Sequence, residues 1–156
     1  MWGDWIDRLW RAGLTAAYQV LRIYWFLARP NTQGVYVAVW QGGRVLVIRN
    51  SYRSPLSLPG GAVGRGEDAA CAAARELREE VGISVDARRL QFVERYVVHE
   101  DYHDDRASFF ELELDREPLL SIDRREVVWA EFRYPEEVLA GSIVTPVRRY
   151  LQRDPH

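Results

Sequence analysis

The sequence has a single cysteine, Cys71, and no lysine. One thiol excludes an intramolecular disulfide and a zinc site built from several thiolates. Because all 21 basic residues are arginine, a lysine nucleophile and a phosphate-binding lysine are also excluded. We expect Cys71 to be a small packed residue of a helix rather than a nucleophile. This cysteine usage fits a reducing compartment, so we expect a cytoplasmic protein.

The chain also has little net charge and no long hydrophobic run. Its formal charge of −2 provides no general attraction to nucleic acid, so a long nucleic acid is not an expected partner. No apolar run reaches the length that spans a bilayer, and the N-terminus lacks the pattern of a signal peptide. The 156 residues are 47% hydrophobic, which is enough to build one folded domain with a core.

Residues 2 to about 28 are expected to form an amphipathic helix, because apolar residues recur mostly at three- and four-residue steps until Pro30. We therefore divide the chain into this helix, residues 1–30, and a domain, residues 31–156. Apolar helix faces usually pack on protein, so we expect contact with the domain or with a second subunit in a homodimer. Peripheral membrane contact is the weaker alternative, because the polar face is not strongly basic.

From residue 34 onward, β-branched and aromatic residues predict strands. The expected strands are 35–40, 44–49, 89–98, 108–114 and 126–134, with a short one at 56–58. Residues 50–55 and 99–106 are expected to be loops, and short helices begin at Pro135 and Thr145. Strands on both sides of a central helix, with further helices flanking them, predict one α/β (α+β) domain.

The central helix follows a turn at Pro59-Gly60-Gly61 and ends at Gly82. Glu76, Glu79 and Glu80 have the i, i+3, i+4 spacing that places side chains on one helical face. A second face is expected to be buried and carries Ala70, Ala73, Ala74, Leu77 and Val81. Clustered carboxylates repel one another unless positive charge lies among them, and Mg²⁺ prefers such oxygen ligands. A solvated, charged helix surface is the alternative interpretation.

The same stretch resembles the Nudix box of the Nudix hydrolases at every defined position. The matching residues are Gly61, then after five residues Glu67, then after seven Arg75-Glu76-Leu77, and finally Glu79-Glu80 and Gly82-Ile83. The resemblance covers roughly residues 34 to 152. It implies an α/β/α sandwich with a mixed sheet, to which the N-terminal helix is an addition. It also implies a metal-dependent pyrophosphohydrolase that cleaves a small nucleoside diphosphate linked to another group.

The resemblance further implies roles for individual residues. Glu76, Glu79 and Glu80, with Glu67 near metal-bound water, would hold Mg²⁺ or alternatively Mn²⁺. Arg75 would orient Glu76, and Glu67 would tie the loop to the helix. Gly60 and Gly61 would let the backbone approach the metal and the substrate.

The motif does not identify the general base or the substrate contacts. The base must lie within about 3 Å of the attacking water. Candidates are Glu79, Glu80 or an accessory acid of the 99–106 loop, namely Glu100, Asp101, Asp104 or Asp105. Tyr52 and Arg53 are candidate contacts to a small-molecule nucleotide. A protein that only binds a nucleotide or a partner is the alternative class, but such a protein would not need the complete carboxylate set.

Overall fold

The computed structural model describes residues 10, 12–14, 16–18, 20, 31–100, 103–122 and 124–153, without the side chains at 31, 32, 96, 98–100 and 103–105. Within these residues, six strands form one sheet in the order β4-β5-β1-β2-β6, with β3 paired to β1. The strands are β1 (Asn31–Gln41), β2 (Arg44–Asn50), β3 (Gly60–Ala62), β4 (Gln91–Glu100), β5 (His103–Glu113) and β6 (Val127–Arg133). The helices are α2 (Ala69–Val81), α3 (Pro135–Ala140) and α4 (Thr145–Leu151), with a 3₁₀ turn at Ala87–Arg89.

Strand β1 is the centre of the sheet. It runs parallel to β5 along one edge and antiparallel to β2 and β3 along the other, so the sheet is mixed. The β1–β2 hairpin closes through Gly42 and Gly43, whose φ angles of 57° and 78° suit glycine in a two-residue turn. The β1–β3 pairing matters most for the site, because it places Gly61 opposite Val35 and Gly60 opposite Tyr36.

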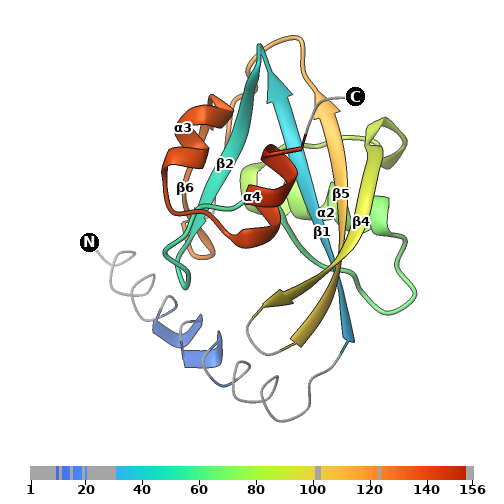
Figure 1. The fold of residues 1–156 in the computed structure, drawn as a ribbon, viewed down its shortest axis with the longest axis vertical. Coiled ribbons are helices and arrows are strands. Elements are labelled where there is room, and N and C mark those ends of the chain that lie inside the picture. The colour runs from blue at the N-terminus through green and yellow to red at the C-terminus, as the bar shows by residue number, and fades with distance from the viewer. Residues whose placement is uncertain are drawn as a thin grey trace.

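Strands β1, β2 and β5 bury alternate residues on the two faces of the sheet. Val35, Val37 and Val39 belong to the core cluster formed with Leu77 and Val81 of α2. The opposite face is covered by α3 and α4, whose buried residues pack on side chains that include Ala38, Val47 and Phe109. Figure 1 shows α4 in front of the sheet and α2 behind it. This arrangement confirms the expected α/β/α sandwich with a mixed sheet.

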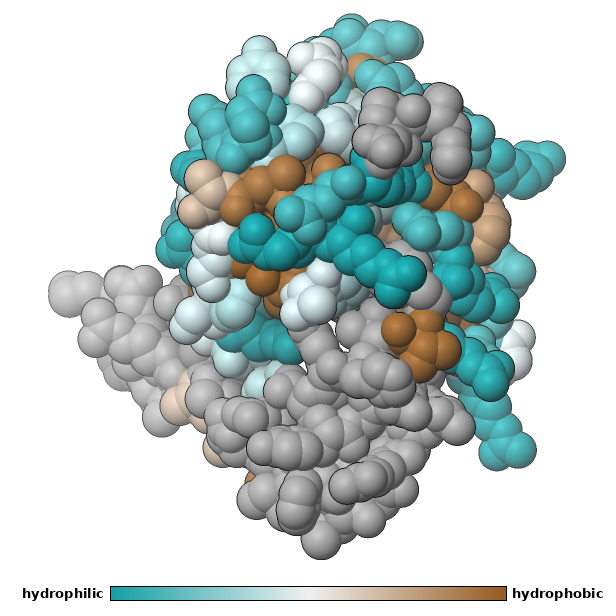
Figure 2. All heavy atoms as spheres, in the orientation of Figure 1, coloured by the Kyte–Doolittle hydropathy of each residue, from teal (hydrophilic) through white to brown (hydrophobic). Residues whose placement is uncertain are grey.

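The outer surface agrees with this layering. The face seen in Figure 2 is mostly hydrophilic where the placement is described, with apolar residues visible between the polar ones. In the described part of the chain, no helix has the length and hydropathy needed to cross a membrane.

The structure differs from the sequence prediction in three segments. Gly60 and Gly61 belong to strand β3 rather than to a turn, because β1 offers an open edge where residues 34–36 bond to them. Residues 56 and 57 make only isolated bridges and form no strand. The expected loop at 99–106 is also wrong, since β4 and β5 continue as a hairpin to the pair Glu100–His103.

Two further expectations concern helical residues. Cys71 is exposed rather than packed, because it lies on the side of α2 that faces away from the core residues Ala72 and Ala73. In the N-terminal segment the described residues are helical, namely Trp10, residues 12–14, residues 16–18 and Val20. The rest of the expected helix lies outside the described residues.

The packing of α2 on the sheet predicts a large difference between two identical substitutions. Leu77 is fully buried in the core, whereas Leu119 is 96% exposed. Leu77→Ala should lower the free energy of unfolding by about 2–5 kcal/mol, because it leaves a cavity between α2 and the sheet. Leu119→Ala should change that free energy by less than about 0.5 kcal/mol. Urea unfolding of both variants checks this, and equal losses would contradict the assignment of the core.

Candidate active site

Helix α2 is positioned by its two ends. At its start, the Asp68 carboxylate accepts hydrogen bonds from the backbone N–H groups of Ala70 and Cys71, at 2.9 and 3.3 Å. At its end, Gly82 adopts the left-handed conformation with φ of 75°, as the sequence predicts. The caps end the helix on both sides, and the packing of Leu77 and Val81 in the core sets the direction in which its glutamates point.

Arg75 connects α2 to the segment that precedes it. Its Nε and Nη2 atoms donate to the two carboxylate oxygens of Glu67, each at 3.0 Å. Its Nη1 donates to Glu76 at 2.6 Å, and Nη2 also donates to the Ala62 carbonyl at 3.1 Å. Glu67 in turn accepts from the Gly64 N–H at 2.8 Å. One guanidinium therefore holds two carboxylates and the end of β3 together.

The two carboxylates held by Arg75 have opposite electrostatic environments. Burial raises the pKa of Glu76 above its ordinary value, and the bond from Arg75 opposes this shift. Hydrogen bonds from Arg75 and from the Gly64 N–H lower the pKa of Glu67. The two acids in turn raise the pKa of the Arg75 guanidinium, which stays charged. The site thus keeps a carboxylate that is largely shielded from water and whose charge is only partly compensated by the protein.

Glu80 and the two glycines form the contact between α2 and β3. The Glu80 side chain is 3% exposed, and its Oε2 accepts from the Gly60 N–H at 2.8 Å. A Cβ on Gly60 would lie 2.0 Å from the Val35 carbonyl oxygen, so this close strand approach requires glycine. A Cβ on Gly61 would lie 2.5 Å from Glu76 Oε1. The missing side chain of Gly61 therefore leaves space beside the Glu76 carboxylate.

Glu79 completes the set but faces solvent. Its side chain is 52% exposed and makes ion pairs with Arg75 at 3.4 Å and with Arg78 at 3.8 Å. The three glutamates expected on one face thus differ in burial, with Glu80 innermost and Glu79 outermost. Among the described residues, no three carboxylate, imidazole or thiol groups converge in the geometry of a formed metal site.

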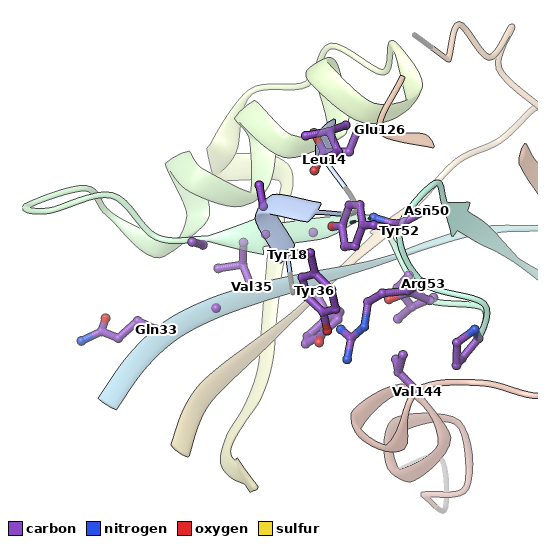
Figure 3. A pocket seen from close by; sticks show the side chains of 18 residues that line it. Leu14, Tyr18, Gln33, Val35, Tyr36, Asn50, Tyr52, Arg53, Glu126 and Val144 are labelled. Atoms are coloured by element: carbon purple, nitrogen blue, oxygen red, sulfur yellow. Dashed lines mark hydrogen bonds between the residues drawn. The ribbon is translucent and has the colours of Figure 1, made fainter. Parts of the chain in front are cut away.

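A cavity of about 380 Å³ opens beside Gly60 and Gly61. Figure 3 shows Tyr18, Tyr36, Tyr52 and Arg53 gathered around one part of it. The sequence-predicted contacts Tyr52 and Arg53 both line this cavity, as do the two glycines. Its remaining walls are mainly apolar, and its polar side chains include Gln33, Asn50, Ser57 and Glu126. A cavity of this size and composition suits a small organic ligand that carries polar groups.

Glu126 is an acid of this cavity that the sequence analysis did not single out. Burial, and then the negative charges of Glu126 and Glu80, raise the pKa of Tyr52 to about 12. The two acids therefore lie close enough to the same phenol to act on it. Glu126 reaches this position because β2 pairs with β6, which sets Asn50 opposite Val127. The sequence offers no local signal for this pairing.

The structure places the backbone of three of the four acids predicted in the 99–106 loop in strands β4 and β5. Asp104 and Asp105 are in β5, where they pair with Asn31 and Thr32 at the beginning of β1. Glu100 is the last residue of β4, and Asp101 lies outside the described residues.

The fold and site together define a class: an α/β/α sandwich with glutamates of one helix held against a glycine strand beside a cavity. A family model of the NUDIX domain matches residues 30–153. The chain belongs to the Nudix hydrolase family, and it is a Nudix hydrolase enzyme. A comparison with curated protein sequences finds no match.

Solved structures with the same fold come from several organisms. A MutT protein from Methanosarcina mazei Go1 has a TM-score of 0.70 at 20% identity, over 81% of this chain and 94% of that one. A C. elegans Ap4A hydrolase in a binary complex has a TM-score of 0.66 at 18% identity, over 78% and 93%. The E. coli dihydroneopterin triphosphate pyrophosphohydrolase has a TM-score of 0.64 at 21% identity, over 77% and 92%. At these identities the likeness shows the fold.

The two carboxylates on Arg75 predict opposite pH dependences of stability in metal-free buffer. The raised pKa of Glu76 means that its ionisation disfavours the folded chain, so wild-type stability falls as pH rises from the ordinary 4.5 through the raised value. Glu76→Gln cannot ionise, and its stability relative to the wild type should rise over this window and then level off.

Glu67→Gln is the matched comparison, because the pKa of Glu67 is lowered from 4.5. The ionised Glu67 carboxylate stabilises the wild-type fold above pH 4.5, and this contribution is lost as the pH falls through the lowered pKa. The relative stability of Glu67→Gln should therefore fall as pH rises through that window. Urea unfolding at a series of pH values measures both curves, and curves of the same sign would contradict the two environments.

Proposed function

We propose that the chain is a divalent-metal-dependent pyrophosphohydrolase that cleaves the diphosphate of a small nucleoside diphosphate linked to another group. The observation that carries this proposal is the position of Glu76 and Glu80 against Gly60 and Gly61, at the edge of a cavity with aromatic walls. Carboxylates that can hold a metal ion for the diphosphate thus adjoin an apolar surface for the rest of the substrate.

The donor set fits Mg²⁺, with Mn²⁺ as an alternative, because every candidate ligand is a hard carboxylate oxygen. We assign the metal to Glu76, Glu79 and Glu80. The space left by the absent side chain of Gly61 gives access to the Glu76 carboxylate. When bound, the metal ion neutralises charge on the diphosphate and makes phosphorus more electrophilic. Mg²⁺ keeps several waters, so a few carboxylates from one helix are a sufficient protein contribution.

The other residues of the motif position these ligands. Arg75 holds Glu76 by a 2.6 Å bond and fixes its orientation, while its bidentate contact with Glu67 anchors the segment before α2. The Gly60 N–H orients the Glu80 carboxylate. Positioning of this kind typically accounts for about 10–100-fold in metal affinity or activity.

We propose Glu126 as the general base that takes the proton of the attacking water. It lines the cavity together with Gly60 and Gly61, and its charge acts on Tyr52 along with that of Glu80. A base must reach the water that attacks phosphorus, and the cavity-lining position of Glu126 satisfies this requirement. Glu80 is less suited, because its Oε2 already accepts from Gly60.

The substrate class rests on three supports. Structural neighbours are named as an Ap4A hydrolase and a dihydroneopterin triphosphate pyrophosphohydrolase, names that describe phosphate-chain substrates of those proteins. The aromatic side chains of the cavity suit a planar ring. The cavity volume of about 380 Å³ suits a small molecule, and the formal charge of −2 disfavours a long nucleic acid.

A nucleotide panel with a metal-ligand variant tests the reaction class. With Mg²⁺, wild-type protein should release a nucleoside monophosphate from at least one diphosphate derivative, and EDTA should abolish this release. Glu79→Gln should lower kcat by about 100-fold or more while leaving the unfolding midpoint unchanged, because Glu79 is exposed. Glu131→Gln, an exposed carboxylate on β6, is the matched control and should retain activity. Full activity of Glu79→Gln, or activity that survives EDTA, would contradict the proposal.

The pH–rate profile tests the general base. Glu126→Gln should lower kcat by about 10²–10⁴-fold and remove the acidic limb of the profile, since the group that must lose its proton is gone. Alanine variants at Glu100, Asp101, Asp104 and Asp105 should keep that limb. The assignment is wrong if Glu126→Gln keeps the wild-type profile while one of these four variants loses the limb.

A further inference from the structure

One wall of the cavity comes from residues that precede the matched domain. The described residues of the N-terminal segment are helical, and the family match begins at residue 30. Leu14, Ala17 and Tyr18 of this segment line the cavity, at spacings of three and four residues that share one helical face. Trp10 and Val20 of the same segment are exposed and do not line it.

Tyr18 joins this wall to the loop after β2. Its ring centroid lies 5.1 Å from that of Tyr52, with the two planes at 40°. The Arg53 guanidinium carbon lies 5.6 Å from the centroid of the Tyr18 ring. In Figure 3, Tyr18, Tyr52 and Arg53 lie around the same part of the cavity. The helix thus brings an aromatic ring to a region that already contains two tyrosines and a cation.

The cavity has two chemically different kinds of lining. Gly60 and Gly61 adjoin the carboxylates of α2, where the diphosphate belongs under the proposed function. The rings of Tyr18, Tyr36 and Tyr52 and apolar side chains such as Leu14 and Val144 form other parts of the wall. Aromatic rings with an adjacent guanidinium suit the face of a planar base, because every base offers a π-face for stacking.

We propose that Tyr18 is a specificity-determining residue, and that its ring is part of the wall against which the base of the nucleoside diphosphate substrate rests. This inference depends on the proposed function for the chemical class of the ligand. The N-terminal helix is then part of the substrate site, and Tyr18 acts on binding of the base rather than on the cleaved bond.

Calorimetric titration of the full-length chain tests this assignment without requiring turnover. The probes are AMP, GMP, CMP and UMP, with ribose 5-phosphate as the matching compound that lacks a base. Wild-type protein should bind at least one nucleotide more tightly than ribose 5-phosphate. Tyr18→Ala should weaken the binding of that nucleotide by about tenfold and leave the binding of ribose 5-phosphate unchanged. Tyr18→Phe should retain the affinity for the nucleotide. Val20→Ala, on the same helix but outside the cavity, should behave like the wild type.

Two results would overturn the proposal. One is wild-type protein that binds none of the four nucleotides more tightly than ribose 5-phosphate, which requires no variant to fold. The other is an equal loss for nucleotide and ribose 5-phosphate in Tyr18→Ala. Hydrolysis is measured separately: Tyr18→Ala should raise KM about tenfold with kcat retained. Selective nucleotide binding through Tyr18 without any hydrolysis would reject the proposed reaction and leave the base-binding role standing.

Discussion

The site depends on one constraint: several carboxylates are clustered on a helix that packs directly against the sheet. Glu76 and Glu80 are both shielded from water, and burial of negative charge disfavours the folded chain unless it is compensated. The protein provides partial compensation through Arg75 for Glu76 and through the Gly60 N–H for Glu80. A divalent cation supplied with the substrate would complete the charge compensation. The electrostatic cost of the carboxylates and the proposed chemistry of the site therefore have the same origin.

The mixed sheet provides what this constraint needs. Pairing of β3 with β1 presses Gly60 against the Val35 carbonyl and aims its N–H at Glu80. The same short strand lies against Glu76 and Glu80 and lines the cavity, so the proposed metal ligands and the proposed substrate surface adjoin one backbone segment. The packing of α2 in the core then holds the glutamates beside that segment. Stability of the sandwich and geometry of the site are therefore set by the same contacts.

The sequence predicted those parts of the site that depend on local spacing. The i, i+3, i+4 order of three glutamates and the glycine cap at Gly82 are properties of a single helix, and the family motif is contained within that stretch. The cavity depends on long-range pairing. Glu126 approaches Tyr52 through the register of β2 with β6, and Tyr18 approaches it from the N-terminal helix. The extended β4–β5 hairpin was missed because its polar residues show no alternating pattern.

The central claim is that the α2 carboxylates bind a divalent metal ion. Electron paramagnetic resonance of Mn²⁺ added to the full-length wild-type chain tests it most directly, because bound and aqueous Mn²⁺ have different spectra. The account predicts that the protein reduces the aqueous signal, that excess Mg²⁺ restores it, and that Glu76→Gln weakens the effect. An aqueous Mn²⁺ spectrum unchanged by the wild-type protein, with and without a nucleoside diphosphate present, would contradict the account.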